Sequence, residues 1–185
     1  MDLSLLPFTV HVPHLTNRVA LAAHLGVRLH PDWPNPNFAQ VLTIFQAWFA
    51  ENPELATWVW FVVVDGEVVG EAGVKALPDD DGCVEIGYGL VPTARGKGTA
   101  TEAVRLLINL AQARGVRKVI AEVLDDNPAS QRVLTKLGFA RVRSAESDEG
   151  PSGWWELDLG EPPTRPETRS PPGRTRRSAR GSRRA

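Results

Sequence analysis

The sequence predicts an α/β (α+β) domain in which helices flank a mixed sheet of about six or seven strands. A β-hairpin is the strongest local signal: residues 58–64 form a continuous apolar run, and Asp65-Gly66 between this run and residues 67–74 favours a tight turn. After residue 97, apolar residues recur about every 3.6 positions instead of every second one, which indicates helices. Hairpins followed by alternating helices and strands are typical of a mixed sheet.

The N-terminal part is predicted to contain one strand and two helices. Residues 8–12 alternate weakly between apolar and polar, which indicates an opening strand. A helix over residues 14–25 is ended by Gly26. A second, amphipathic helix covers residues 38–50, and the proline-rich segment 31–36 separates the two helices.

The remainder of the chain is predicted to alternate helices with four strands. Gly115 ends the first of these helices, and Asn127-Pro128 is a typical start for the second, which Gly138 ends. The predicted strands are residues 83–91, 119–124, 139–143 and 154–159, and the first of these helices covers residues 97–114.

Composition divides the chain into a globular body, residues 1–160, and an Arg/Pro-rich tail, residues 161–185, that is predicted to be disordered. The tail holds eight Arg and two Glu, a charge of +6, so the body carries −7 of the overall −1. Nucleic-acid contact through the tail is one interpretation. The absence of aromatic residues favours a solvated, nonspecific arm instead.

The sequence gives no indication of a metal, a disulfide or a membrane segment. Cys83 is the only cysteine, and the four histidines lack metal-ligand spacing. Neither a signal peptide nor a stretch of about 18 apolar residues is present. We therefore expect a cytoplasmic protein that does not contact membranes, while the oligomeric state stays open.

The main functional motif is the loop at residues 95–100, between a predicted strand and a predicted helix. Gly96 and Gly98 allow the backbone to approach a ligand, the helix N-terminus attracts negative charge, and Arg95 and Lys97 add two cations. The loop thus suits a pyrophosphate. The alternative is a tight turn that binds nothing, with two solvated basic side chains.

Two motifs resemble the GNAT superfamily of acetyltransferases. The sequence Arg95-Gly-Lys-Gly-Thr-Ala100 resembles its Arg/Gln-x-x-Gly-x-Gly/Ala signature for coenzyme A, and residues 127–139 resemble its second coenzyme A-contacting helix. Glu85-Ile-Gly-Tyr88, together with Asn127-x-x-Ser130 and Val133-Leu134, is most similar to the branch of the ribosomal-protein-alanine N-acetyltransferases. This resemblance implies a mostly antiparallel central sheet and acetyl-CoA as cosubstrate, with no metal.

The resemblance also implies the residues that bind the cofactor. Backbone amides of the strand before the loop hold the pantetheine arm and polarise the thioester carbonyl in this family, while the loop amides hold the pyrophosphate. The implied cofactor-binding residues are Leu90, Val91, Arg95, Gly96, Lys97, Gly98, Thr99, Ala100, Asn127, Ser130 and Lys136.

Proton transfer is less well specified by the resemblance. Many relatives use a tyrosine as acid where this chain has Leu134. In the ribosomal-protein branch a serine three residues after the Asn is a proposed acid, which implies Ser130, and relatives often carry a carboxylate base on the strand before the loop, which implies Glu85. Ser130 as a helix-start residue, Glu85 as a strand-face carboxylate and Glu122 as a rival base are the alternatives. The expected activity is acetyl transfer to a primary amine, either a small molecule or a protein N-terminus. The alternatives are a non-catalytic acyl-CoA sensor and a nucleic-acid binder.

Overall fold

The computed structural model describes residues 2–8 and 14–160 of the 185-residue chain. The predicted tail at residues 161–185 lies outside the described residues, as does most of the strand predicted at residues 8–12. No helix in the described part is long and apolar enough to cross a bilayer.

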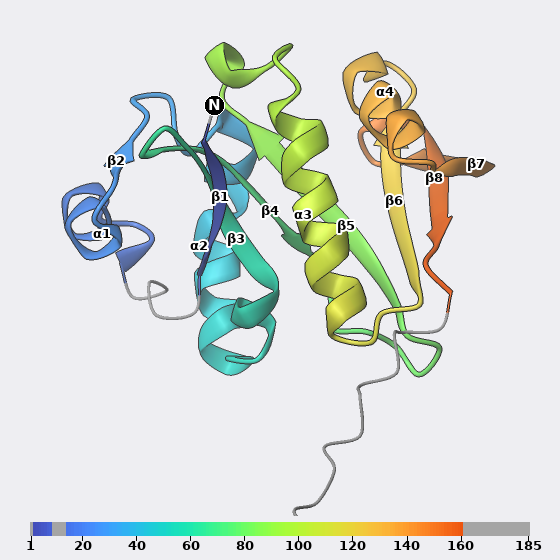
Figure 1. Cartoon of the computed structure of the whole chain (residues 1–185), viewed down its shortest axis with the longest axis horizontal. Coiled ribbons are helices and arrows are strands. Elements are labelled where there is room, and N and C mark those ends of the chain that lie inside the picture. Colours follow the sequence, from blue (N-terminus) through green and yellow to red (C-terminus); the bar gives the residue numbers. More distant parts are fainter. Residues whose placement is uncertain (1, 9–13, 161–185) are drawn as a thin grey trace, which may run out of the picture.

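The core of the fold is an eight-stranded sheet, which confirms the predicted fold class with one strand more than expected (Figure 1). Its order is β1-β3-β4-β5-β6-β8-β7, and the short β2 pairs with β4. Only β5–β6 and β2–β4 are parallel. The strands are β1 Leu3–Pro7, β2 Arg28–Leu29, β3 Val59–Val64, β4 Glu67–Val74, β5 Cys83–Leu90, β6 Lys118–Leu124, β7 Ala140–Ser147 and β8 Gly150–Asp158.

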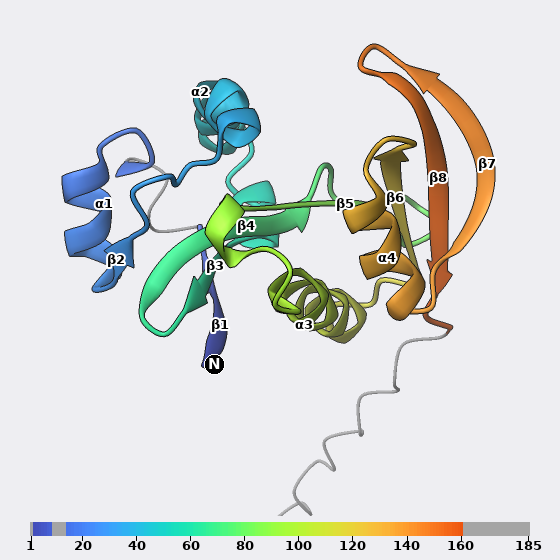
Figure 2. The same ribbon diagram turned by 90° about the horizontal axis from the view of Figure 1, so that it is seen from above.

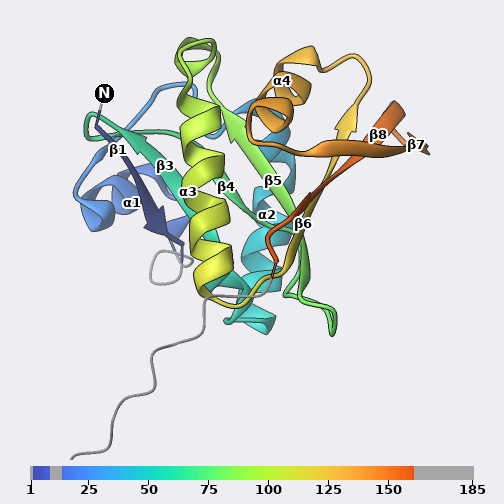
Figure 3. The same cartoon turned by 45° about the vertical axis from the view of Figure 1, so that its right-hand side comes forward.

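Helices cover both faces of the sheet. Figure 2 shows α2 on one side of the central strands and α3 on the other, and Figure 3 shows α4 beside the N-terminal end of α3. The described α-helices are α1 Arg18–Leu25, α2 Pro36–Glu51, α3 Thr99–Ala113 and α4 Pro128–Lys136. Two 3-10 helices cover Leu55–Trp58 and Pro92–Ala94.

The N-terminal predictions needed correction. The opening strand is Leu3–Pro7, where Leu3 pairs with Val64 at the sheet edge, and Phe8 is a buried core residue instead. Helix α1 begins at Arg18 and not at residue 14, because the side chain of Asn17 caps it by accepting from the Ala20 amide at 3.0 Å.

The central predictions are confirmed. Asp65 and Gly66 both have positive φ, 48° and 77°, as the tight turn of the hairpin requires. Helix α3 buries the predicted stripe of Ala103, Val104 and Leu107 against the sheet.

The C-terminal hairpin is longer than predicted. Strands β7 and β8 extend to a turn at Asp148 and Glu149. The prediction was short because β7 is almost entirely exposed, so its sequence lacks the apolar alternation that marks a half-buried strand.

The functional site is created where β5 loses one of its two neighbours. Strand β5 pairs with β4 along one edge as far as Leu90, whereas only Cys83 to Glu85 pair with β6 along the other edge. Strands β5 and β6 therefore diverge after Glu85, which opens the sheet beside the loop that leads into α3.

Candidate active site

The divergence of β5 and β6 exposes a row of backbone amides. Glu85 and Val91 bond to β4, since the Glu85 carbonyl accepts from the Lys75 amide at 2.8 Å and the Val91 amide donates to Val69 at 2.9 Å. Backbone groups of a strand alternate between its two sides. The amides of Tyr88 and Leu90 therefore face the gap, where they can donate to a ligand.

A cavity of about 920 Å³ extends from one face of the sheet to the other beside this gap. Residues of the loop, α3 and α4 line it on one face. Asn35, Phe38, Phe45 and Glu71 line it on the face where α2 begins. The cavity thus joins the predicted cofactor site to a second compartment on the α2 face.

The start of α3 supplies donors for a phosphate. Gly98 caps the helix in a left-handed conformation, with φ of 85° and no side-chain cap. The first helical bond runs from the Glu102 amide to the Gly98 carbonyl at 3.0 Å, so the amides of Ala100 and Thr101, which line the cavity, have no helical acceptor. These amides and the helix dipole favour an anion at this end of the cavity.

Three cationic side chains line the same part of the cavity. Arg95 is held against β5 by a bond from its Nε to the Leu90 carbonyl at 3.0 Å. Arg132 and Lys136 lie four residues apart on one face of α4, and both line the cavity. Arg132 was missed in the sequence, although its i, i+4 spacing from Lys136 was an available signal.

The structure brings most of the predicted cofactor residues to this cavity. Three do not line it: the amide of Val91 already bonds within the sheet, Thr99 is buried, and Lys97 faces elsewhere. The predicted residues that line it are Leu90, Arg95, Gly96, Gly98, Ala100, Asn127, Ser130 and Lys136.

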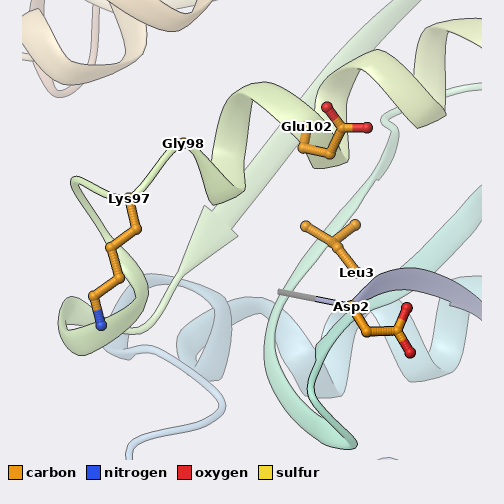
Figure 4. A pocket seen from close by; sticks show the side chains of 5 residues that line it. All are labelled: Asp2, Leu3, Lys97, Gly98 and Glu102. Carbon is orange, nitrogen blue, oxygen red and sulfur yellow. The ribbon is translucent and has the colours of Figure 1, made fainter.

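Lys97 lines a smaller hollow of about 450 Å³ beside the start of β1. Figure 4 shows the Lys97 side chain directed along the loop, and Asp2 and Glu102 on the other side of the hollow. Two carboxylates in so small a space do not suit a phosphate. The structure therefore gives no support to Lys97 as a phosphate ligand.

Ser130 and Tyr88 meet on the cofactor side of the sheet. The Ser130 amide donates to the capping side chain of Asn127 at 3.1 Å, and the Tyr88 hydroxyl donates to the Ser130 carbonyl at 3.4 Å. Among the described residues, the Ser130 hydroxyl has no hydrogen-bond partner, so it is available to a ligand. Leu134 is fully buried. Burial raises the pKa of Tyr88 above its usual value, while its hydrogen bond to Ser130 acts in the opposite direction.

Neither carboxylate considered in the sequence lines the cavity. Glu85 forms an ion pair with Lys75, and Glu122 accepts a hydrogen bond from Ser152 at 2.6 Å. Lys75 itself lines the cavity, so the Lys75 side chain lies between the Glu85 carboxylate and the cavity.

Glu71 is the cavity carboxyl that sequence reasoning missed. It is 7% exposed, and it accepts hydrogen bonds from Trp33 Nε1 at 3.1 Å and Asn35 Nδ2 at 2.7 Å. Burial raises its pKa from 4.5 to about 8, while the two hydrogen bonds act in the opposite direction. A charged residue inside a buried strand was the available signal.

Two glycines on β5 differ in how close they lie to Glu71. A Cβ on Gly89 would lie 2.3 Å from Glu71 Oε1, whereas one on Gly87 would meet only Lys75 Cε at 3.8 Å. We expect Gly89→Ala to lower the free energy of unfolding by roughly 1–3 kcal/mol and Gly87→Ala to lower it much less. Urea unfolding of both variants measures this, and equal losses would contradict the close packing of Glu71 on Gly89.

Comparisons with known proteins agree with this geometry. The acetyltransferase (GNAT) domain family matches residues 4–140. The N-acetyltransferase YjdG of Bacillus subtilis (strain 168) is 34% identical over 119 residues, which are 62% of this chain and 71% of YjdG.

Two solved structures share the fold. The ribosomal α-N-protein acetyltransferase RimL in complex with coenzyme A superimposes with a TM-score of 0.64 at 20% identity, covering 85% of this chain and 94% of RimL. A ribosomal-protein-S5-alanine acetyltransferase from Vibrio fischeri superimposes with a TM-score of 0.60 at 17% identity. The match covers 84% of this chain and 91% of the Vibrio protein. The family match therefore covers most of the body, and the chain belongs to the GNAT family of acetyl-CoA-dependent acyltransferases.

Proposed function

We propose that this chain transfers the acetyl group of acetyl-CoA to the nitrogen of a primary amine, by direct attack of the amine on the thioester. The observation that carries the proposal is the cavity that joins the two faces of the sheet beside the β5–β6 gap. A two-substrate transfer needs such a passage, because the acyl donor and the acceptor must meet at one point.

The cofactor half of the cavity matches the parts of acetyl-CoA in order. The amides of Ala100 and Thr101, with Arg95, Arg132 and Lys136, would hold the phosphates. The gap-facing amides of Tyr88 and Leu90 would hold the pantetheine arm and polarise the thioester carbonyl. The described residues include no group of three or more potential ligands that could hold a metal ion.

An amine panel tests the activity. Release of free coenzyme A from acetyl-CoA is measured with small primary amines and with peptides that bear free N-termini. Turnover with at least one amine, and an acetylated product by mass spectrometry, is the expected result. Tight binding of acetyl-CoA without turnover on any amine would contradict the proposal and favour a sensor.

Ser130 is the proposed acid that protonates the departing thiolate. We expect Ser130→Ala to lower kcat roughly 10- to 100-fold and to change the Kd for acetyl-CoA little, because the Asn127 cap bonds to the backbone amide of Ser130 and not to its side chain. Stopped-flow transfer rates and calorimetric binding measure the two quantities.

The matched control is Thr135→Ala on the same helix. The Thr135 hydroxyl bonds only to the Gln131 carbonyl, at 2.8 Å, and Thr135 does not line the cavity. Its kcat should equal that of the wild type. An unchanged kcat in Ser130→Ala would remove Ser130 from the mechanism.

A further inference from the structure

The α2 side of the cavity contains a flat strip of backbone where β4 and β5 face each other. Gly73 lies directly opposite Gly87, so no side chain rises from the middle of the strip. Glu71 opposite Gly89 bounds one end, and the Lys75–Glu85 ion pair bounds the other. This strip is the floor on which an acceptor can lie.

We infer that Glu71 is the catalytic base of this site, and that the acceptor is a small primary amine on an apolar or aromatic arm, whose amino group reaches the Glu71 carboxyl across the glycine floor. The inference rests on the proposed acetyl transfer and replaces Glu85 as the base.

Position along β5 favours Glu71 over Glu85. The gap-facing amides that can hold the thioester belong to Tyr88 and Leu90, and each is one residue, about 3.4 Å, from Gly89. Glu71 Oε1 lies directly over Gly89, at 2.3 Å from the place of its missing Cβ. Glu85 lies three residues, about 10 Å, from Tyr88.

The surroundings of Glu71 suit a carboxyl that first binds the ammonium group of the acceptor and then removes a proton from it. Trp33 and Asn35 each donate to a different carboxyl oxygen, which fixes the carboxyl plane and leaves each oxygen a further acceptor site. Its pKa of about 8 results from burial, with no charged neighbour among the causes. A base with this pKa is matched to an amine at neutral to mildly alkaline pH.

Other charged groups also line the cavity. Lys75, directly after β4, is paired with Glu85. Arg95, Arg132 and Lys136 belong to the loop and α4, and Glu149 belongs to the β7–β8 turn, which lies on the same side of the sheet as α2 (Figure 2). Glu149 is exposed, so Glu71 is the buried carboxyl among the described lining residues.

The wall above the floor determines the rest of the acceptor. Phe38 and Phe45 of α2 lie 5.9 Å apart between ring centroids, and with Val59 they line the cavity on this side. Aromatic rings and a valine favour an apolar arm behind the amino group. Because Glu71 is only 7% exposed, a slender amine reaches its carboxyl more readily than a branched one.

The transfer step moves two protons. One ammonium proton passes to the Glu71 carboxylate, and the freed nitrogen pair forms a bond to the acetyl carbon. The carbon–sulfur bond breaks with its electron pair on sulfur. The Ser130 hydroxyl protonates that sulfur and takes up the second proton from nitrogen. Amide and free thiol result, and Glu71 returns its proton to water.

The first test is the pH dependence of kcat/KM with 2-phenylethylamine, which has the inferred aromatic arm. The wild type should show a rising limb with a midpoint near pH 8, because kcat/KM reports the free enzyme. Glu71→Gln should lose this limb and about 100-fold or more of kcat/KM at pH 8. Glu71→Asp should keep the limb at a lower rate, and Glu85→Gln should keep it as well.

The second test does not depend on turnover. The carboxyl of Glu71 is titrated by carbon NMR in the full chain with coenzyme A present, and its signal is assigned with Glu71→Asp. Adding 2-phenylethylamine should lower the titration midpoint by about one pH unit, because an ammonium stabilises the carboxylate. The neutral analogue 2-phenylethanol should not.

The outcomes separate this inference from the proposed function. A limb that persists in Glu71→Gln, or a midpoint that the amine leaves unchanged, overturns the role of Glu71, even if other amines are acetylated. A shifted midpoint without any turnover keeps the amine site and refutes the acetyl transfer.

Discussion

Gly98→Asp should raise the Kd for acetyl-CoA about 100-fold or more, a loss of roughly 2.7 kcal/mol. Gly98 lies between the loop and the amides of Ala100 and Thr101 at the start of α3. A carboxylate there repels the phosphates and competes with them for the same amides. Calorimetric titration of acetyl-CoA measures the loss without reference to activity.

Two control variants separate charge from backbone strain. Gly98→Asn introduces a side chain of nearly the same shape without charge, and Asn tolerates the positive φ of this position comparatively well. Gly115→Asp adds the same charge at φ of 90° near the far end of α3, about 22 Å along the helix. Both should bind acetyl-CoA far more tightly than Gly98→Asp. Equal weakening in all three would show that the loop does not bind the pyrophosphate.

Most of the fold could be predicted because local signals and burial agree in its central part. The Asp65-Gly66 turn and the α3 stripe each combine a turn or cap residue with a periodic apolar pattern. The predictions failed where tertiary context decides the structure. Strand β7 is exposed, and β1 forms because Leu3 to Pro7 pair with β3, more than fifty residues away.

The candidate site was predictable only where one stretch of sequence makes it. The loop from Arg95 to Ala100 and the Asn127 helix each carry their own signal. The gap between β5 and β6 depends on register, which the sequence of β5 alone does not specify. Glu71 acquires its surroundings from Trp33 and Asn35, which lie 38 and 36 residues earlier in the chain.

Glu71 should also make the stability of the unliganded protein fall as pH rises. Its pKa is raised in the folded state, so between about pH 4.5 and 8 the unfolded chain releases this proton while the folded chain keeps it. The unfolded state then binds fewer protons, and the free energy of unfolding decreases with pH over this window. The free energy of unfolding falls by roughly 3–5 kcal/mol in total, and nearly all of this stability is lost by pH 8.

Urea unfolding of the wild type and Glu71→Gln at pH 5 and pH 8 isolates this contribution. The variant should gain stability relative to the wild type by roughly 3–5 kcal/mol between the two pH values, because glutamine cannot ionise. Val74→Ala, a buried change on the same strand without a titratable group, should cost the same at both pH values. If the Glu71→Gln difference is also independent of pH, the carboxyl is ionised throughout. The proton that it exchanges with an amine would then have to be sought on another residue.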